Sequence, residues 1–154
     1  MPVHESPDRD TMIPDLNNLL NYKNDRLIAR YNRDFPQSKM DADDALTELM
    51  KFIWLCHKHQ SDRTDYPHQS SYNFNCVIHA EMDDIDNMWH TFLLFTRDYH
   101  RFCQDYLDGS FFHHEPMDNQ DDVILEDYEL ELSRYLSYIY DHLGESTLIK
   151  WFNP

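Results

Sequence analysis

Apolar side chains recur at three- and four-residue intervals along this chain, and that spacing constrains the fold more than any other feature. A repeat near 3.6 residues places apolar side chains on one face of a helix, whereas strict alternation is typical of a strand. We find the helical spacing in several segments and no alternating stretch. In the clearest segment, 83–107, the apolar positions are Ile85, Met88, Trp89, Phe92, Phe95, Tyr99, Phe102 and Tyr106. The sequence therefore predicts an all-α fold.

Four main helices are expected. The first runs from about residue 14 to 32, the second begins near Asp41, whose carboxylate can cap free amides, and a long irregular connection follows between 61 and 78. The third spans 83–107 and ends before Gly109; a kink or break is expected near Thr96, which could cap a second helical piece. The fourth spans about 120–142. Residues 1–11 form a flexible polar arm, and 12–154 a single helical domain.

The net charge of this chain limits the classes of partner that it can be expected to bind. It has 154 residues, with 13 Lys and Arg against 29 Asp and Glu, which gives a net charge of −16. Such a surface repels phosphate backbones, so no nucleic-acid partner is expected, whereas a basic protein partner would suit it. With only 2 glycines, the chain has no Gly-rich phosphate loop. No apolar run approaches the roughly 20 residues that cross a bilayer, so no membrane insertion is expected.

Cysteine usage and the N-terminal sequence bear on location. The 3 cysteines are an odd number at wide spacing, which favours a reducing compartment over a disulfide framework. The N-terminal residues lack the basic start and apolar stretch of a secretory signal. The expected location is therefore cytoplasmic where the protein is made. Export by a specialised bacterial secretion system stays open, because such signals need not look like this.

One pair of residues in the third helix has the spacing of metal ligands. Asp86 and His90 lie four residues apart, on one helical face at the edge of the apolar stripe. A third ligand would come from His113 or His114 in the following turn. Two imidazoles and one carboxylate leave coordination positions open, which fits Zn²⁺ with a bound water or non-haem Fe²⁺. The alternative is a solvated Asp86–His90 ion pair, with the two adjacent histidines serving as cap and packing residues.

Two of the cysteines, Cys103 and Cys56, are further candidate metal ligands, and a structural role is favoured for both. Cys103 follows His90 by thirteen residues, which an unbroken helix would separate by about 20 Å. It reaches the site only if the segment breaks near Thr96, so a buried structural thiol is the favoured interpretation. Cys56 lies on the apolar stripe of the second helix and receives the same interpretation. No serine stands in a recognisable strained turn, and a Cys103–His113 couple is possible with nothing in the sequence to orient it.

The segment from Ile85 to Tyr99, with the residues after it, resembles uncharacterised bacterial relatives of the glycine-rich domain-containing proteins. The family core has an acidic residue three before a Trp-His pair, then a Tyr, a Cys, a Gly and a His. The positions that match are Asp86, Trp89, His90, Tyr99, Cys103, Gly109 and His113. Many relatives carry another histidine where this chain has Phe92, and the glycine-rich tail of larger members is absent. The resemblance implies motif positions and no particular reaction.

The leading hypothesis is a small acidic helical domain that binds a divalent metal near the Trp-His motif, either structurally or catalytically. A metal-free interaction module is the second hypothesis: a secreted bacterial effector or an acidic inhibitor of a basic partner. A metal-dependent hydrolase or oxygenase is the third, since a metal-bound water or an open iron site could serve either chemistry.

Overall fold

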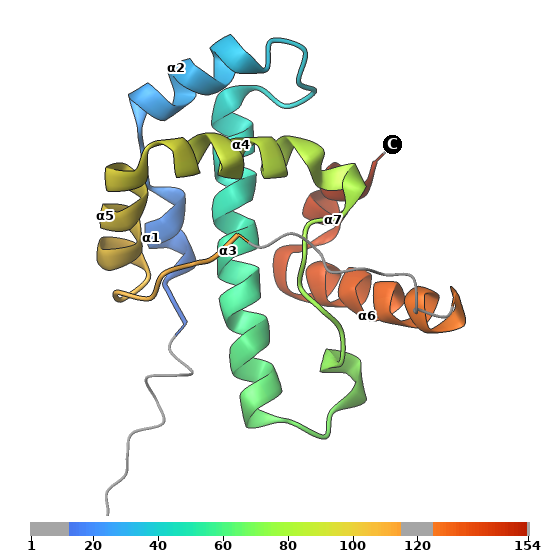
Figure 1. Cartoon of the computed structure of the whole chain (residues 1–154). Coiled ribbons are helices and arrows are strands. Elements are labelled where there is room, and N and C mark those ends of the chain that lie inside the picture. The colour runs from blue at the N-terminus through green and yellow to red at the C-terminus, as the bar shows by residue number, and fades with distance from the viewer. Residues whose placement is uncertain (1–12, 115–124, 154) are drawn as a thin grey trace, which may run out of the picture. The chain divides into compact units, whose positions relative to one another are not determined.

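The computed structural model describes residues 13–114 and 125–153, so the predicted N-terminal arm, 1–11, lies outside the described residues. Within them every regular element is a helix, which confirms the all-α class (Figure 1). No helix among them is long and apolar enough to cross a membrane. The α-helices are α1 (Leu16–Leu20), α2 (Asp25–Asp34), α3 (Ala42–Asp65), α4 (Asp83–Leu94), α5 (Thr96–Tyr106), α6 (Leu125–Leu143) and α7 (Glu145–Phe152). Two short 3₁₀ helices are η2 (Ser70–Tyr72) and η3 (Ala80–Met82).

The expectation of four main helices is wrong, because the described residues form seven α-helices. The first predicted helix is divided after Leu20. The Asn24 side chain accepts a hydrogen bond from the Leu27 amide at 3.1 Å and so caps α2. An asparagine that bonds neighbouring backbone competes with helix continuation and favours a helix start. One predicted helix therefore becomes α1 and α2.

The third predicted helix is also divided, close to the expected place. Phe95 has φ −94° and ψ 72°, outside the helical region, and separates α4 from α5. Thr96 is the first residue of α5 and not its cap.

The C-terminal residues add a further helix, α7, after Gly144. The predicted cap of the second helix is present, because the Asp41 carboxylate accepts from the Asp44 amide at 2.8 Å.

The chain divides into two compact units, which we describe separately. Within the described residues, the α4 unit comprises 14–54 and 78–114, and the α6 unit comprises Ile13, 55–77 and 125–153. Helix α3 contributes its residues up to Trp54 to the α4 unit and the rest to the α6 unit. It extends to Asp65, so the predicted irregular connection begins at residue 66, five residues later than the expected residue 61.

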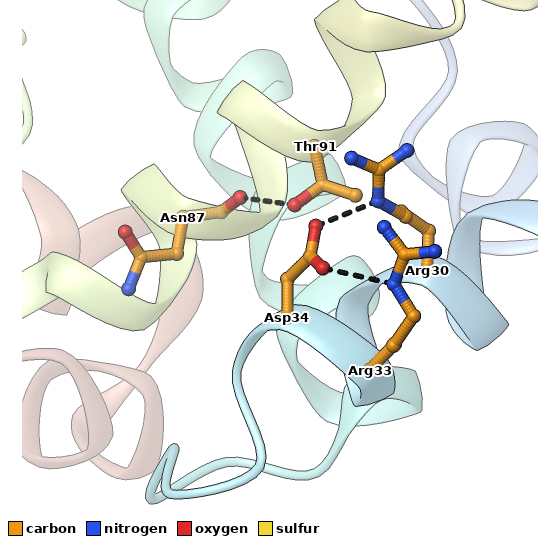
Figure 2. Close-up of polar contacts among 5 residues, drawn as sticks. All are labelled: Arg30, Arg33, Asp34, Asn87 and Thr91. Carbon is orange, nitrogen blue, oxygen red and sulfur yellow. Dashed lines mark hydrogen bonds and ion pairs between the residues drawn. The ribbon is translucent and has the colours of Figure 1, made fainter.

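In the α4 unit, α4 packs against α2 and α5. The core is rich in aromatic side chains, and its largest buried members are Tyr31, Phe52, Trp89, Phe92, Tyr99 and Phe102. Figure 2 shows polar contacts on α2 and α4: Asp34 binds the guanidinium groups of Arg30 and Arg33, and the Thr91 hydroxyl donates to the Asn87 carbonyl at 2.8 Å. The hydrogen bond from Arg30 contributes most to lowering the pKa of Asp34.

In the α6 unit, α6 packs against α7 and η2. Phe74 is buried and stacks on the rings of both His59 and Tyr135. The Tyr138 hydroxyl donates to the buried Asp62 carboxylate at 2.5 Å, and Lys58 pairs with the same carboxylate at 2.9 Å. Asp62 thus has two partners, as a buried charge requires.

Candidate functional site

Helix α4 brings Asp86 and His90 to one side, as their four-residue spacing predicts. The distance between Asp86 Oδ1 and His90 Nε2 is 3.8 Å. The side chain of His90 is 53% exposed and that of Asp86 32% exposed, so the pair lies at the surface of the α4 unit. Both groups are therefore within reach of an ion or a small molecule from solvent.

The third member of the site is His114, which lies far from α4 in sequence. Its Nε2 is 2.7 Å from Asp86 Oδ1, and its ring centroid is 4.4 Å from that of His90. The side chain of His114 is 16% exposed, since its ring lies edge-on to Trp89 at 4.2 Å. One carboxylate oxygen and two imidazole nitrogens, from Asp86, His90 and His114, thus lie within 4.8 Å of one another.

Packing of Phe112 positions the segment that carries His114. The Phe112 ring stacks on Trp89 with centroids 4.7 Å apart and an interplanar angle of 10°. The Tyr99 hydroxyl donates to the Phe112 carbonyl and accepts from the Trp89 indole N–H at 3.1 Å. Burial raises the pKa of Tyr99 well above its usual value, so this hydroxyl keeps the proton that it donates. Trp89 and Tyr99 therefore fix the backbone two residues before His114.

The turn after α5 directs the chain back toward α4. Asp108 and Gly109 both have positive φ, 56° and 82°, and the Gly109 amide donates to the Cys103 carbonyl at 3.1 Å. This bond joins residues six positions apart and, together with the Leu107 amide that donates to the same carbonyl at 3.0 Å, closes the end of α5. Gly109 therefore ends α5 as predicted, and the reversal lets 110–114 reach the side chains of α4.

The structure separates the two adjacent histidines, which the sequence treated as equivalent candidates. His114 joins Asp86 and His90, whereas His113 is exposed and its ring lies 4.7 Å from Phe111. Cys103 is also outside the group of three. It is buried beside Tyr99 and Phe112, and burial raises the pKa of its thiol. A buried, protonated thiol fits the structural role predicted for Cys103.

The two distances from Asp86 Oδ1 to the histidine nitrogens lie on either side of the spacing in a tetrahedral metal site. Zn²⁺ bonds of about 2.0–2.1 Å place neighbouring ligand atoms about 3.3 Å apart. Here the Asp86–His90 distance is 3.8 Å and the Asp86–His114 distance is 2.7 Å. Small side-chain rotations would equalise them, with the ion replacing the hydrogen bond between Asp86 and His114. The same three groups can otherwise act as a hydrogen-bonded surface cluster.

Comparison with known proteins identifies no relative: no family model matches the chain, and no curated protein or solved structure matches it significantly. The resemblance to the relatives of the glycine-rich domain-containing proteins therefore stays a prediction from the motif.

Proposed function

We propose that this chain binds one divalent transition-metal ion through Asp86, His90 and His114. The observation that carries the proposal is the convergence of one carboxylate oxygen and two imidazole nitrogens within 4.8 Å. Two histidines and one carboxylate suit Zn²⁺ with a bound water, or non-haem Fe²⁺. Three protein ligands leave at least one coordination position for water, and the exposure of His90 gives solvent access to the site.

The packing around His114 supports the proposal, because a metal site needs ligands that are held before the ion arrives. His114 follows the Phe112 backbone, which Tyr99 and Trp89 hold in place. Asp86 and His90 share one helix. His90 is the most exposed of the three side chains, at 53% against 32% for Asp86 and 16% for His114.

Metal analysis of protein purified without an affinity tag tests this function. We expect one equivalent of Zn²⁺ or Fe²⁺ per wild-type chain, and loss of the metal in His90→Ala and in His114→Ala. His113→Ala is the matched control, because it removes an exposed neighbouring histidine outside the cluster. Sub-stoichiometric metal in the wild type, or metal content unchanged by His90→Ala, would eliminate the proposal.

Thermal unfolding provides a second measurement. A ligand at a hundred times its Kd stabilises the folded state by about 2.7 kcal/mol. For a chain of this size that corresponds to a rise in Tm of roughly 5–10 °C. We expect the rise on adding Zn²⁺ to metal-free wild type and to His113→Ala, and its absence in His114→Ala.

A metal-free interaction module is the second candidate, and one feature of α6 favours it. Leu130 is 51% exposed near the start of this helix, among the exposed acidic residues Glu126, Asp127 and Glu129. An apolar contact with an acidic rim suits a basic protein surface. We expect capture of such a partner to weaken with rising salt and in Leu130→Ser. Capture that is indifferent to both would argue against this candidate.

A further inference from the structure

Two cysteines of the α6 unit have their sulfur atoms almost in bonding position. Cys56 lies in α3 and Cys76 in the irregular segment between η2 and η3, and their Sγ atoms are 3.1 Å apart. A disulfide bond is about 2.05 Å long, so the sulfurs need to approach by only about 1 Å. Both thiols are free and half-buried.

The backbone around Cys76 is held by α6 independently of the cysteines. The Tyr135 hydroxyl donates to the Val77 carbonyl at 2.8 Å, and the Asn75 amide donates to the Glu131 carboxylate at 2.8 Å. Phe74, two residues before Cys76, stacks on Tyr135 with centroids 5.4 Å apart. These contacts fix the chain on both sides of Cys76, so the short distance between the sulfurs is built into the fold.

We propose that Cys56 and Cys76 form a reversible dithiol–disulfide pair, oxidised by small-molecule disulfides and reduced by thiols. In the first step, one cysteine sulfur bonds to a sulfur of the small disulfide and releases one small thiol. In the second, the other cysteine sulfur attacks the mixed disulfide and releases the second small thiol. Two electrons pass from the pair to the oxidant, and the two cysteine protons end on the released thiols.

The surroundings of the two thiols assign them different roles. The Cys56 thiol donates to the Cys76 carbonyl at 3.5 Å and to the Cys76 sulfur at 3.1 Å, so its proton is held by hydrogen bonds. Burial, followed by the neighbouring Cys76 thiol, also raises the pKa of Cys56 well above its usual range, so Cys56 is the poorer first nucleophile. Cys76 therefore opens the exchange and Cys56 completes it. The product closes residues 56–76 into a covalent loop that ties α3 to the segment held by α6.

Mass spectrometry of the full chain exposed to oxidised glutathione tests the proposal. We expect the monomer to lose the mass of two hydrogen atoms and tryptic peptide 52–58 to become linked to peptide 64–97. Cys103→Ala should behave as wild type, because that thiol is buried in the α4 unit. Absence of this link in folded protein, a link to Cys103, or links only between chains would each overturn the proposal.

Single cysteine variants test the order of the two steps. Cys56→Ser should accumulate a glutathione adduct on Cys76, and Cys76→Ser should be modified at Cys56 several-fold more slowly. Equal rates in the two variants would overturn the assigned order. The intramolecular disulfide should form equally in His90→Ala, so its outcome is independent of the metal proposal.

Thermal unfolding shows whether the fold already holds the sulfurs in position. A loop of this length, closed without strain, should raise the Tm of the oxidised protein by roughly 6–12 °C. Addition of a reducing thiol should reverse the shift. A lower Tm after oxidation would mean that bond formation distorts the fold, which contradicts the proposed preorganisation.

Discussion

Replacement of Tyr99 by Phe tests how the fold positions His114. The change removes one hydroxyl and leaves the buried ring in place. That hydroxyl donates to the Phe112 carbonyl and accepts from the Trp89 indole N–H. Tyr99 and Trp89 are 1% and 5% exposed, so water cannot readily replace the lost bond to the indole.

The expected loss of stability follows from these two bonds. A buried polar group left without a partner costs about 1–3 kcal/mol. Trp89 is 5% exposed whereas Phe112 is half-buried, so we assign most of the cost to the indole N–H. We therefore expect Tyr99→Phe to lower the free energy of unfolding by about 2 kcal/mol, or the Tm by roughly 4–8 °C.

Urea unfolding and amide hydrogen exchange measure the two consequences. Exchange at residues 110–114 should become faster relative to the rest of the α4 unit, because one of the contacts that hold Phe112 is lost. Tyr106→Phe is the control: it removes a hydroxyl from the same helix, one that makes no hydrogen bond within the described residues. A Tyr99→Phe protein within about 0.5 kcal/mol of wild type, with unchanged exchange at 110–114, would refute the proposed role of this hydroxyl.

Two further predictions concern the α6 unit. Gly144→Ala should cost about 1–3 kcal/mol of stability in urea unfolding, because φ 93° and ψ 169° lie in a region open essentially to glycine; a neutral substitution would contradict this. For His59, burial lowers the pKa below about 6.5, so its contribution to stability is present above that pH and is lost as the pH falls toward the folded-state pKa. An NMR titration midpoint of 6.5 or higher for His59 would refute the assignment.

The two helix breaks show what apolar periodicity can and cannot predict. The apolar spacing of 83–107 continues through Phe95, so periodicity alone cannot locate the break that separates α4 from α5. The first break had a local signal, since Asn24 is a residue type that caps helices, and it caps α2 here. The sequence nevertheless predicts one long helix over 14–32, because the apolar residues on both sides of Asn24 keep the helical period.

The candidate site likewise has one part that the sequence predicts and one part that it does not. The pairing of Asp86 with His90 follows from helix geometry, which depends on residues only four apart. The choice of His114 over His113 depends on the stacking of Phe112 on Trp89 and the bond from Tyr99. The Cys56–Cys76 pair had no sequence signal, because twenty residues separate the thiols and α6 holds the segment that brings them together.

By itself, the sequence determined the helical class, the cap at Asp41 and the shared face of Asp86 and His90. These features depend on backbone preferences and on side chains within one or two helical turns. Tertiary structure alone decided which histidine meets Asp86 and which thiols meet each other. Those contacts join residues distant along the chain, and their geometry depends on how buried aromatic side chains pack, which no local pattern encodes.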